Sequence, residues 1–296
     1  MQLRPYQHDF VSAIYQAWQQ GAPNVLGVMP TGAGKAVAVS YVLSQEPSPS
    51  VIIAHRQELI GQLCLTLAQF GVRHRIIGPQ ALIQMAVEIQ MDELGTSFYD
   101  PSAPCGVAGV DTLIRRKGKL GNWPDQVTLK VHDEAHHDLR ENKWGKADAM
   151  FPNARGLGVT ATACRADGKG LGRHADGFYD VLIHGPTMRE LINMGALSEY
   201  RIFAPPTDLN LDDVKISATT GDFNKDQLRK EVRRSHIVGD VVEHYLRIAP
   251  GLLGITFAVD VATATDIAFK YNEAGVSAEV INAKTPDRIR HEFIRR

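Results

Sequence analysis

The sequence alternates short apolar runs with longer segments of helical periodicity, and this alternation constrains the fold more than any other feature. Five runs are each followed by polar residues: NVLGVM (24–29), SVIIAH (50–55), CGVAGVDTLI (105–114), VTLKVHDEAH (127–136) and GLGVTAT (156–162). Helical stretches such as RQELIGQLCLTLAQFG (56–71) lie between them. Strands that alternate with helices predict a parallel sheet with helices on both faces. Ligands bind such sheets at the carboxyl ends of the strands, so we expect the polar residues to converge there.

The first run leads into MPTGAGKAVAV (29–39), which contains the glycines and the lysine of a phosphate-binding loop. The full pattern is G-x-x-x-x-G-K-[ST] between a strand and a helix. Backbone N–H groups at the start of the helix can bind phosphate oxygens, and Lys35 would reach the β- and γ-phosphates. The residues expected to bind the nucleotide here are Thr31, Gly32, Ala33, Gly34, Lys35 and Ala36. The alternative is a glycine-rich turn with an incidental lysine, because Met29 and Ala36 depart from the pattern.

Two adjacent carboxylates, Asp133 and Glu134, follow the fourth apolar run. At the carboxyl end of a strand, Asp133 can hold Mg²⁺ through its water shell, and Glu134 can orient an attacking water. Together with Lys35 they are the expected catalytic residues. Two alternatives stay open: a zinc site built from neighbouring histidines, whose order differs from H-E-x-x-H, and a charged turn without catalytic function.

Composition limits the class of protein. The 296 residues are 44% hydrophobic and 22% charged, with a net charge of -1, so any binding of nucleic acid must use local basic patches. The three cysteines are scattered, which predicts neither disulfides nor a cysteine zinc site. No signal peptide or membrane-spanning run is present in the sequence, so we expect a cytoplasmic protein, in the host cytoplasm if a phage encodes it.

The character of the sequence changes after about residue 165, and three segments are expected. Residues 1–165 form the first α/β domain, 166–235 a connecting or inserted segment, and 236–296 the start of a second α/β domain. In this last part GLLGITFAVDVATATDIAFKYNEAG (251–275) predicts a strand and then a helix, and VSAEVINAK (276–284) predicts another strand. About 60 residues are too few for a complete domain of this kind.

These segments occur in the order of a known set of motifs, and the chain resembles the superfamily-two helicases and translocases of the DEAD/DEAH-box type, in particular their phage and bacterial branch. The matching segments are LRPYQ (3–7), MPTGAGK (29–35), AHRQEL (54–59), GVDTLIRR (109–116), DEAH (133–136), TAT (160–162) and GITFAVDVATA (254–264). Each motif is a weak signal alone, but their order along the chain is specific to the family. The resemblance implies a RecA-like P-loop NTPase domain followed by an incomplete second RecA-like domain.

The resemblance also implies roles for further residues, with ATP and Mg²⁺ as cofactors. Gln7, with Arg4, would recognise the adenine edge, since a side-chain amide can pair with adenine's donor and acceptor together. Two residues, Arg56 and Thr112, would contact the backbone of single-stranded or duplex DNA or RNA without reading its sequence. Three residues would have coupling roles. His136 would join the DEAH segment (133–136) to the TAT segment (160–162), and Thr160 and Thr162 would couple the ATP site to the nucleic acid.

Three departures from the family pattern bear on activity. Ala36 cannot supply the hydroxyl that normally ligates Mg²⁺, so we expect weaker binding of Mg-ATP and slower hydrolysis. Ala163 stands where the family usually has proline. The motifs that carry the arginine fingers would lie beyond Arg296, and such a finger is worth about 10³–10⁵ in rate.

The expected function is therefore ATP hydrolysis coupled to movement on DNA or RNA by a DEAH-type helicase or translocase, with hydrolysis impaired by Ala36 and by the missing arginine-finger motif. One alternative is a catalytically silent nucleotide- or nucleic-acid-binding module or remnant. Another is the motor subunit of a restriction-type complex, in which a partner chain would supply the missing motifs.

Overall fold

The computed structural model describes residues 1–55, 57–165, 168–204, 208, 210–212, 214–215, 223–235, 237–286, 289–290 and 293. The chain divides into two compact units, Met1–Glu199 and Tyr200–Arg296.

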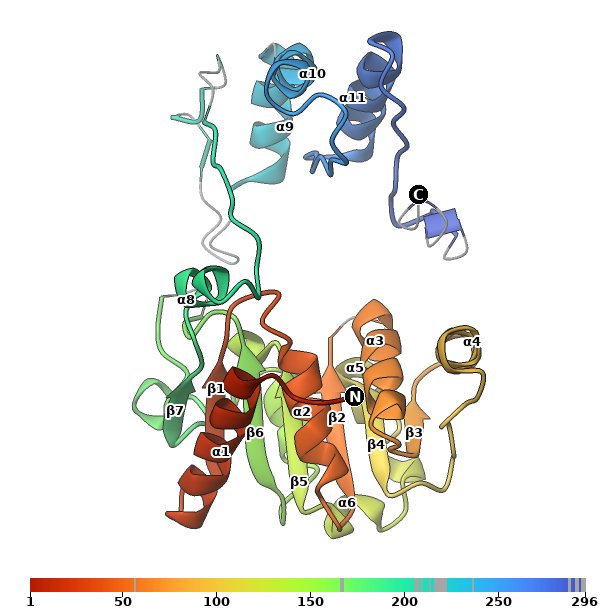
Figure 1. Ribbon diagram of the computed structural model, residues 1–296, viewed down its shortest axis with the longest axis vertical. Coiled ribbons are helices and arrows are strands. Elements are labelled where there is room, and N and C mark those ends of the chain that lie inside the picture. The colour runs from red at the N-terminus through yellow and green to blue at the C-terminus, as the bar shows by residue number, and fades with distance from the viewer. Residues whose placement is uncertain are drawn as a thin grey trace. The chain divides into compact units, whose positions relative to one another are not determined.

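The first unit is built on a seven-stranded sheet with the order β3-β4-β2-β5-β6-β1-β7, in which every neighbouring pair is parallel (Figure 1). The strands are β1 (Asn24–Val28), β2 (Ser50–Ala54), β3 (His74–Ile77), β4 (Cys105–Gly109), β5 (Leu129–Asp133), β6 (Arg155–Thr160) and β7 (Val181–His184). The predicted parallel sheet is confirmed. Five strands fall in the five apolar runs, and β3 and β7 are additional.

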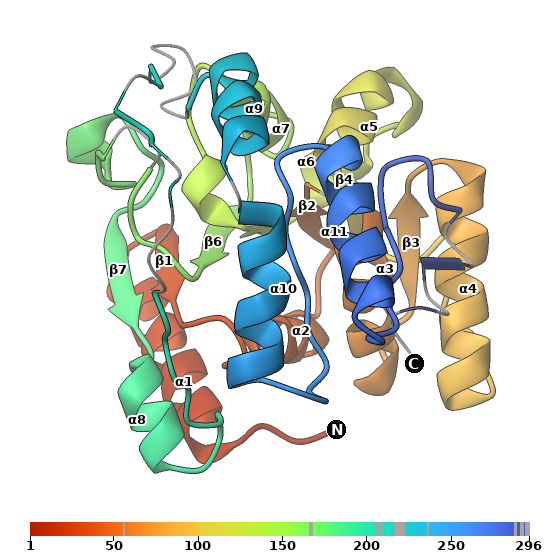
Figure 2. The ribbon, with the colours of Figure 1, turned by 90° about the horizontal axis from the view of Figure 1, so that it is seen from above.

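Helices cover both faces of this sheet, as Figure 2 shows from above. The helices of the unit are α1 (Pro5–Gln19), α2 (Lys35–Ser44), α3 (Gln57–Gln69), α4 (Gln80–Leu94), α5 (Val110–Arg115), α6 (Trp123–Gln126), α7 (Lys143–Asp148) and α8 (Met188–Asn193), with 3-10 turns η1 (Lys117–Lys119), η2 (Ala135–His137) and η3 (Arg173–Ala175). Buried residues of α1 to α4 form one core on one face, and residues of α5 to α7 form a second core on the other.

The alternation of side chains along a strand explains how one strand serves both cores. In β2, Ile52 and Ala54 lie in the core under α1 to α4, whereas Val51 and Ile53 lie in the core under α5 to α7. All four side chains are buried, which is why the strand reads as a continuous apolar run. The same alternation decides which side chains of β5 face which side of the sheet.

The first helix begins and ends where its sequence predicts. Pro5 occupies the first turn, where a missing N–H costs nothing, and Gly21 ends the helix with a φ of 90°. The buried residues Phe10, Val11 and Ile14 face the sheet. This packing fixes the N-terminal segment beside the start of α2.

The first unit extends past residue 165, the end expected for the first domain. Strand β7 pairs with β1 over Val25–Val28, and α8 follows it. Leu191 of α8 belongs to the core under α1 to α4. Residues up to Glu199 therefore belong to the same compact unit as the sheet.

The second unit contains α9 (Lys225–Arg234), α10 (Ile237–Ile248) and α11 (Val261–Glu273). A small core joins α10 to α11 through Val242, Ile267 and Tyr271. The predicted helix at α11 is confirmed, but the described residues of 251–260 and 276–284 form no strand, contrary to expectation. Strand hydrogen bonds need a paired neighbour, and the described residues of this unit provide none; Phe257 in the first run is 92% exposed.

Candidate nucleotide site

The strand order brings the glycine-rich loop and the acidic residues to the same edge of the sheet. β6 lies between β5 and β1, and all three are parallel. Asp133 is in register with Val159, and Thr160 is in register with Val28. The last residues of three adjacent strands therefore lie side by side.

Two glycines give the loop its conformation. Gly32 and Gly34 have φ values of 83° and 80°, in the left-handed region that favours glycine. Gly34 directly precedes α2, so the loop opens into the N-terminus of a helix. A Cβ at Gly32 would lie 2.8 Å from Leu197 Cδ2, and a Cβ at Gly34 would overlap Gln7 Nε2. Thr31 is exposed at the tip of this loop and Ala33 is buried. This strand–loop–helix arrangement is the context of a phosphate-binding loop.

The side chain of Gln7, in α1, binds the backbone of the glycine-rich loop. Its Nε2 donates to the carbonyls of Ala33 (3.1 Å) and Gly34 (3.3 Å), and its Oε1 accepts from the backbone N–H of Arg4 (2.9 Å). The side chain is only 3% exposed. Both the nitrogen and the oxygen of the amide make hydrogen bonds within the protein, so Gln7 has a structural task in the loop.

Tyr6 is a contact that the sequence did not single out. Its hydroxyl donates to the carbonyl of Ala33 at 3.1 Å. The only sequence signal is its place beside Gln7 in the LRPYQ segment. Leu197, which touches Gly32, gave no signal at all, because it lies far along the chain in a segment expected to be a connector.

Lys35 is held inside the loop. Its ammonium donates to the carbonyls of Met29 (3.2 Å) and Pro30 (3.3 Å). Burial lowers the pKa of Lys35, and the charges of Glu134 and Asp133 partly oppose this shift. The lysine and the two carboxylates therefore lie close enough to interact electrostatically.

Asp133 lies at the end of β5 in a partly buried environment. Burial raises the pKa of Asp133 to about 6; the charge of Glu134 adds to the shift, and a hydrogen bond to the Glu134 backbone and the charge of Lys35 oppose it. Two carboxylates side by side with reduced hydration favour a proton or a cation between them. This donor chemistry fits Mg²⁺ through Asp133, whereas Ala36 at the start of α2 contributes no oxygen to a cation.

Glu134 has an unusual backbone. Its φ of 55° lies in the left-handed region, which is costly for a residue with a Cβ. It precedes the turn η2, and its Oε2 lies 3.3 Å from Nδ1 of His136. The carboxylate is thus placed between the strand end and the following turn.

His136 contacts the end of β6. Its Nδ1 lies 3.0 Å from Oγ1 of Thr160, and the same hydroxyl oxygen contacts both the N–H and the carbonyl of Thr162 at 3.1 Å. The three residues that the family resemblance pairs as coupling residues are therefore joined by direct hydrogen bonds.

The histidines near β5 do not form a metal centre. Nδ1 of His132 donates to Asp138, and although burial lowers the pKa of His132, the charge of Asp138 and this hydrogen bond raise it overall. The rings of His136 and His137 lie 4.1 Å apart between centroids. Across the described ranges, no group of three or more His, Cys, Asp or Glu residues is arranged to hold a metal, so the structure gives the zinc alternative no support.

Of the two residues expected to contact nucleic acid, Thr112 lies among the described residues and follows β4. Thr112 is in α5, where its Oγ1 accepts from Arg115 Nη2 at 3.4 Å. Arg115, Lys117 and Lys119 are exposed. Arg56 lies outside the described residues.

The seven-stranded parallel sheet, the loop after β1 and the carboxylates after β5 define the chain as a P-loop NTPase with a RecA-like sheet. A family model described as "Type III restriction enzyme, res subunit" matches residues 1–165. The chain belongs to this family, and its resemblance to the superfamily-two helicases and translocases is confirmed.

Three proteins of known sequence are similar over most of this chain. A "51.5 kDa protein" of Lactococcus phage (isolate 7-9) is 27% identical, over 90% of this chain and 50% of its own length. The "Putative mitochondrial ATP-dependent helicase irc3" of Schizosaccharomyces pombe is 24% identical over 99% of this chain and 47% of its own. The "Putative ATP-dependent helicase IRC3" of Saccharomyces cerevisiae is 26% identical over 99% of this chain and 42% of its own length. The chain thus spans about half the length of these relatives.

Among solved structures, the UvsW helicase from bacteriophage T4 is similar at 17% identity, with a TM-score of 0.45 over 62% of this chain and 60% of that one. Among the helices described here, none combines the length and the apolar character needed to cross a membrane.

Proposed function

We propose that this chain binds ATP between the glycine-rich loop and the carboxylates of β5, as part of an ATP-dependent helicase or translocase of the DEAH-box type. The observation that carries the proposal is the strand order, which ends β1 and β5 at the same edge of the sheet and brings the loop of Lys35 near Asp133 and Glu134. These residues are nearly a hundred positions apart in the sequence and meet because β1 and β5 end at the same edge. A cation facing two carboxylates is suited to a triphosphate and its divalent metal.

Each group would have a distinct task in this proposal. Lys35 and the loop from Thr31 to Ala36 would bind phosphates, and Asp133 would hold Mg²⁺ through water; the bound metal would neutralise phosphate charge. Glu134 would orient the attacking water, while Arg4 and Gln7 would lie beside the adenine. The His136–Thr160–Thr162 hydrogen bonds support coupling of this site to DNA or RNA held by Arg56 and Thr112.

Two further proposals rest on specific observations. The alanine at position 36 supports a module that binds nucleotide without turning it over. The description of the matching family supports a motor subunit of a restriction-type complex, whose partner would supply an arginine finger. We further propose that residues 236–296 begin a second RecA-like domain and that the protein acts in the cytoplasm, in the host's if its origin is that of the phage relative.

A binding and hydrolysis experiment tests the proposal. Affinity for a fluorescent ATP analogue with Mg²⁺ is measured for the native chain and for Lys35→Ala, and ATPase rates are measured with and without single-stranded DNA or RNA. Binding that Lys35→Ala weakens at least about tenfold supports the site, because the lysine contacts phosphate charge. Hydrolysis stimulated by nucleic acid supports the motor, and binding without hydrolysis supports the silent module. If the native chain binds neither nucleotide nor nucleic acid, all three proposed functions are refuted.

A further inference from the structure

A buried cluster joins the two residues that flank the acidic segment. His132 is the residue before Asp133, and Asp138 follows the turn η2. Nδ1 of His132 lies 2.9 Å from Oδ2 of Asp138, and the two side chains are 4% and 0% exposed. Facing a carboxylate, the ring nitrogen is the donor. The hydrogen bond therefore closes the segment 132–138 on itself.

Tyr179 is the third member of this cluster and comes from the segment before β7. Its hydroxyl donates to the same Oδ2 of Asp138. Its ring lies against Gly158 of β6, where a Cβ would overlap the ring. The glycine in β6 is thus needed for the tyrosine to reach the carboxylate.

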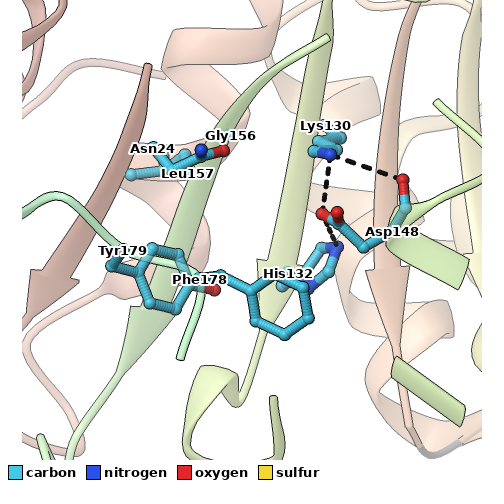
Figure 3. A pocket seen from close by; sticks show the side chains of 8 residues that line it. All are labelled: Asn24, Lys130, His132, Asp148, Gly156, Leu157, Phe178 and Tyr179. Carbon is cyan, nitrogen blue, oxygen red and sulfur yellow. Dashed lines mark hydrogen bonds and ion pairs between the residues drawn. The ribbon is translucent and has the colours of Figure 1, made fainter. Parts of the chain in front are cut away.

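The cluster continues along the face of the sheet that carries Lys130 and His132. Nε2 of His132 lies 3.7 Å from Oδ1 of Asp148, and the same oxygen pairs with Nζ of Lys130 at 2.7 Å. Figure 3 shows these side chains around a small cavity that Tyr179 and Phe178 also line. The rings of Trp144 and Phe178 contact the imidazole at 5.7 and 6.2 Å between centroids, so packing fixes its orientation.

The segment that this cluster closes contains the strained Glu134. A non-glycine residue with a φ of 55° keeps that conformation only where its surroundings determine it strongly. Local hydrogen bonds from His137 N to Glu134 O (3.1 Å) and from Asp138 N to Ala135 O (3.0 Å) shape the turn. They lie within the turn. Asp138 attaches the turn to β5 and to the segment before β7 through His132 and Tyr179, and the His136–Thr160 hydrogen bond attaches it to β6.

We propose that Asp138, held by His132 and Tyr179, is a positioning residue that keeps Glu134 in its left-handed conformation facing the nucleotide site. The proposal deepens the proposed function, on which it rests for the task of Glu134. None of the three side chains needs to touch the nucleotide.

Hydrogen–deuterium exchange of the nucleotide-free chain tests the positioning without any activity. The amides of His137 and Asp138 are the probes, because both are hydrogen-bonded in the turn. Tyr179→Phe keeps the ring and removes the hydroxyl, and Asp138→Asn weakens both hydrogen bonds. We expect exchange at these amides to rise about tenfold in each variant, since loss of one buried hydrogen bond to a charged group has effects of this size.

Thr128→Val is the matched control. The Thr128 hydroxyl also donates to a buried carboxylate, Oε1 of Glu46 at 3.0 Å, but Thr128 precedes β5 and lies at the opposite edge of the sheet. This variant is expected to leave exchange at His137 and Asp138 unchanged. If Tyr179→Phe leaves it unchanged too, or if Thr128→Val raises it equally, the positioning proposal is overturned. Tyr179→Phe keeps the test decisive if Asp138→Asn does not fold.

A second pair of variants distinguishes the effect of losing the hydrogen bond from the effect of changing the side-chain volume at position 132. His132→Asn retains a donor near the position of Nδ1, whereas His132→Leu does not. We expect exchange near the native rate in the first and about tenfold faster exchange in the second. Equal exchange in both would overturn the proposal.

Kinetics then distinguish this proposal from the proposed function. If the native chain hydrolyses ATP, Tyr179→Phe should lower kcat about tenfold and change the affinity for ATP less than about threefold, because only the water-orienting carboxylate moves. An unchanged kcat would overturn the positioning. A native chain that does not hydrolyse ATP, but shows the expected exchange, would contradict the hydrolytic function and leave the positioning supported.

Discussion

Nδ1 of His136 lies 3.0 Å from Oγ1 of Thr160, and this contact joins the turn after β5 to the end of β6. The carbonyl of Thr160 in turn accepts from the N–H of Met29 at 3.1 Å, at the start of the glycine-rich loop. A continuous set of hydrogen bonds therefore crosses three adjacent strand ends. Such a set can transmit a change at one end only if it has two arrangements, which makes its individual bonds worth testing.

Replacing His136 by alanine should uncouple nucleic acid from hydrolysis. We expect stimulation of the ATPase by single-stranded nucleic acid to fall about fivefold to tenfold, because one hydrogen bond of roughly 1 kcal/mol is lost. Affinity for the ATP analogue should change little. The adjacent, more exposed His137→Ala serves as control, and equal losses in both variants would contradict a specific role for the contact.

Gly34→Ala should disturb the loop in two ways. The φ of 80° is strained for alanine by about 1 kcal/mol, and the new Cβ would displace the amide of Gln7. Gly95→Ala, at a φ of 69° with open space around it, reproduces the strain alone. We expect thermal unfolding to show a loss of about 1 kcal/mol for Gly95→Ala and at least about 2 kcal/mol for Gly34→Ala. Similar losses for the two would show that Gln7 does not brace the loop.

The parallel sheet and the meeting of its strand ends were predictable, because the apolar runs carry the strand signal directly. Lys35, Asp133 and Glu134 follow from that placement and from their residue types. His74–Ile77 was missed because β3 is short and begins with two basic side chains. β7 was missed because Gly-rich sequence precedes it, and only its pairing with β1 reveals it.

Contacts between distant segments could not be predicted from residue types. Asp138 reads as one more acidic residue in a charged turn, yet it is fully buried between His132 and Tyr179. Likewise, nothing in the sequence indicates that Leu197 touches Gly32. In the second unit the apolar runs resemble strands, but a strand forms only with a partner, which periodicity alone does not supply.

Asp133 should make stability depend on pH. Its pKa is raised from the model-compound value of 3.8 to about 6, so the folded state prefers the protonated form. This preference stabilises the folded state. The stabilisation is fully present below about pH 4 and is lost as the pH rises through about 6. Asp133→Asn should therefore stabilise the nucleotide-free chain at pH 8 by on the order of 1–3 kcal/mol and have little effect at pH 4.

Thermal unfolding at the two pH values checks this expectation. The exposed Asp92 of α4 provides the control variant, Asp92→Asn. A stabilisation by Asp133→Asn that is the same at pH 4 and pH 8 would contradict the raised pKa. The same variant should also weaken binding of the Mg²⁺–nucleotide complex, so that stability and function move in opposite directions.

Ala36→Thr should increase ATP hydrolysis. The alanine is the second residue of α2, half-buried against the core under α1 to α4, and it offers no oxygen to a metal. A threonine hydroxyl at this position would add an oxygen ligand for Mg²⁺, which demands near-octahedral coordination. We expect a rise of about tenfold or more in rate at saturating Mg²⁺ and ATP, because metal electrostatics dominate phosphoryl transfer. Ala36→Val has the same shape without the hydroxyl and isolates packing. If valine raises the rate as much as threonine, or if threonine has no effect while nucleotide still binds, the alanine at this position is not what limits turnover.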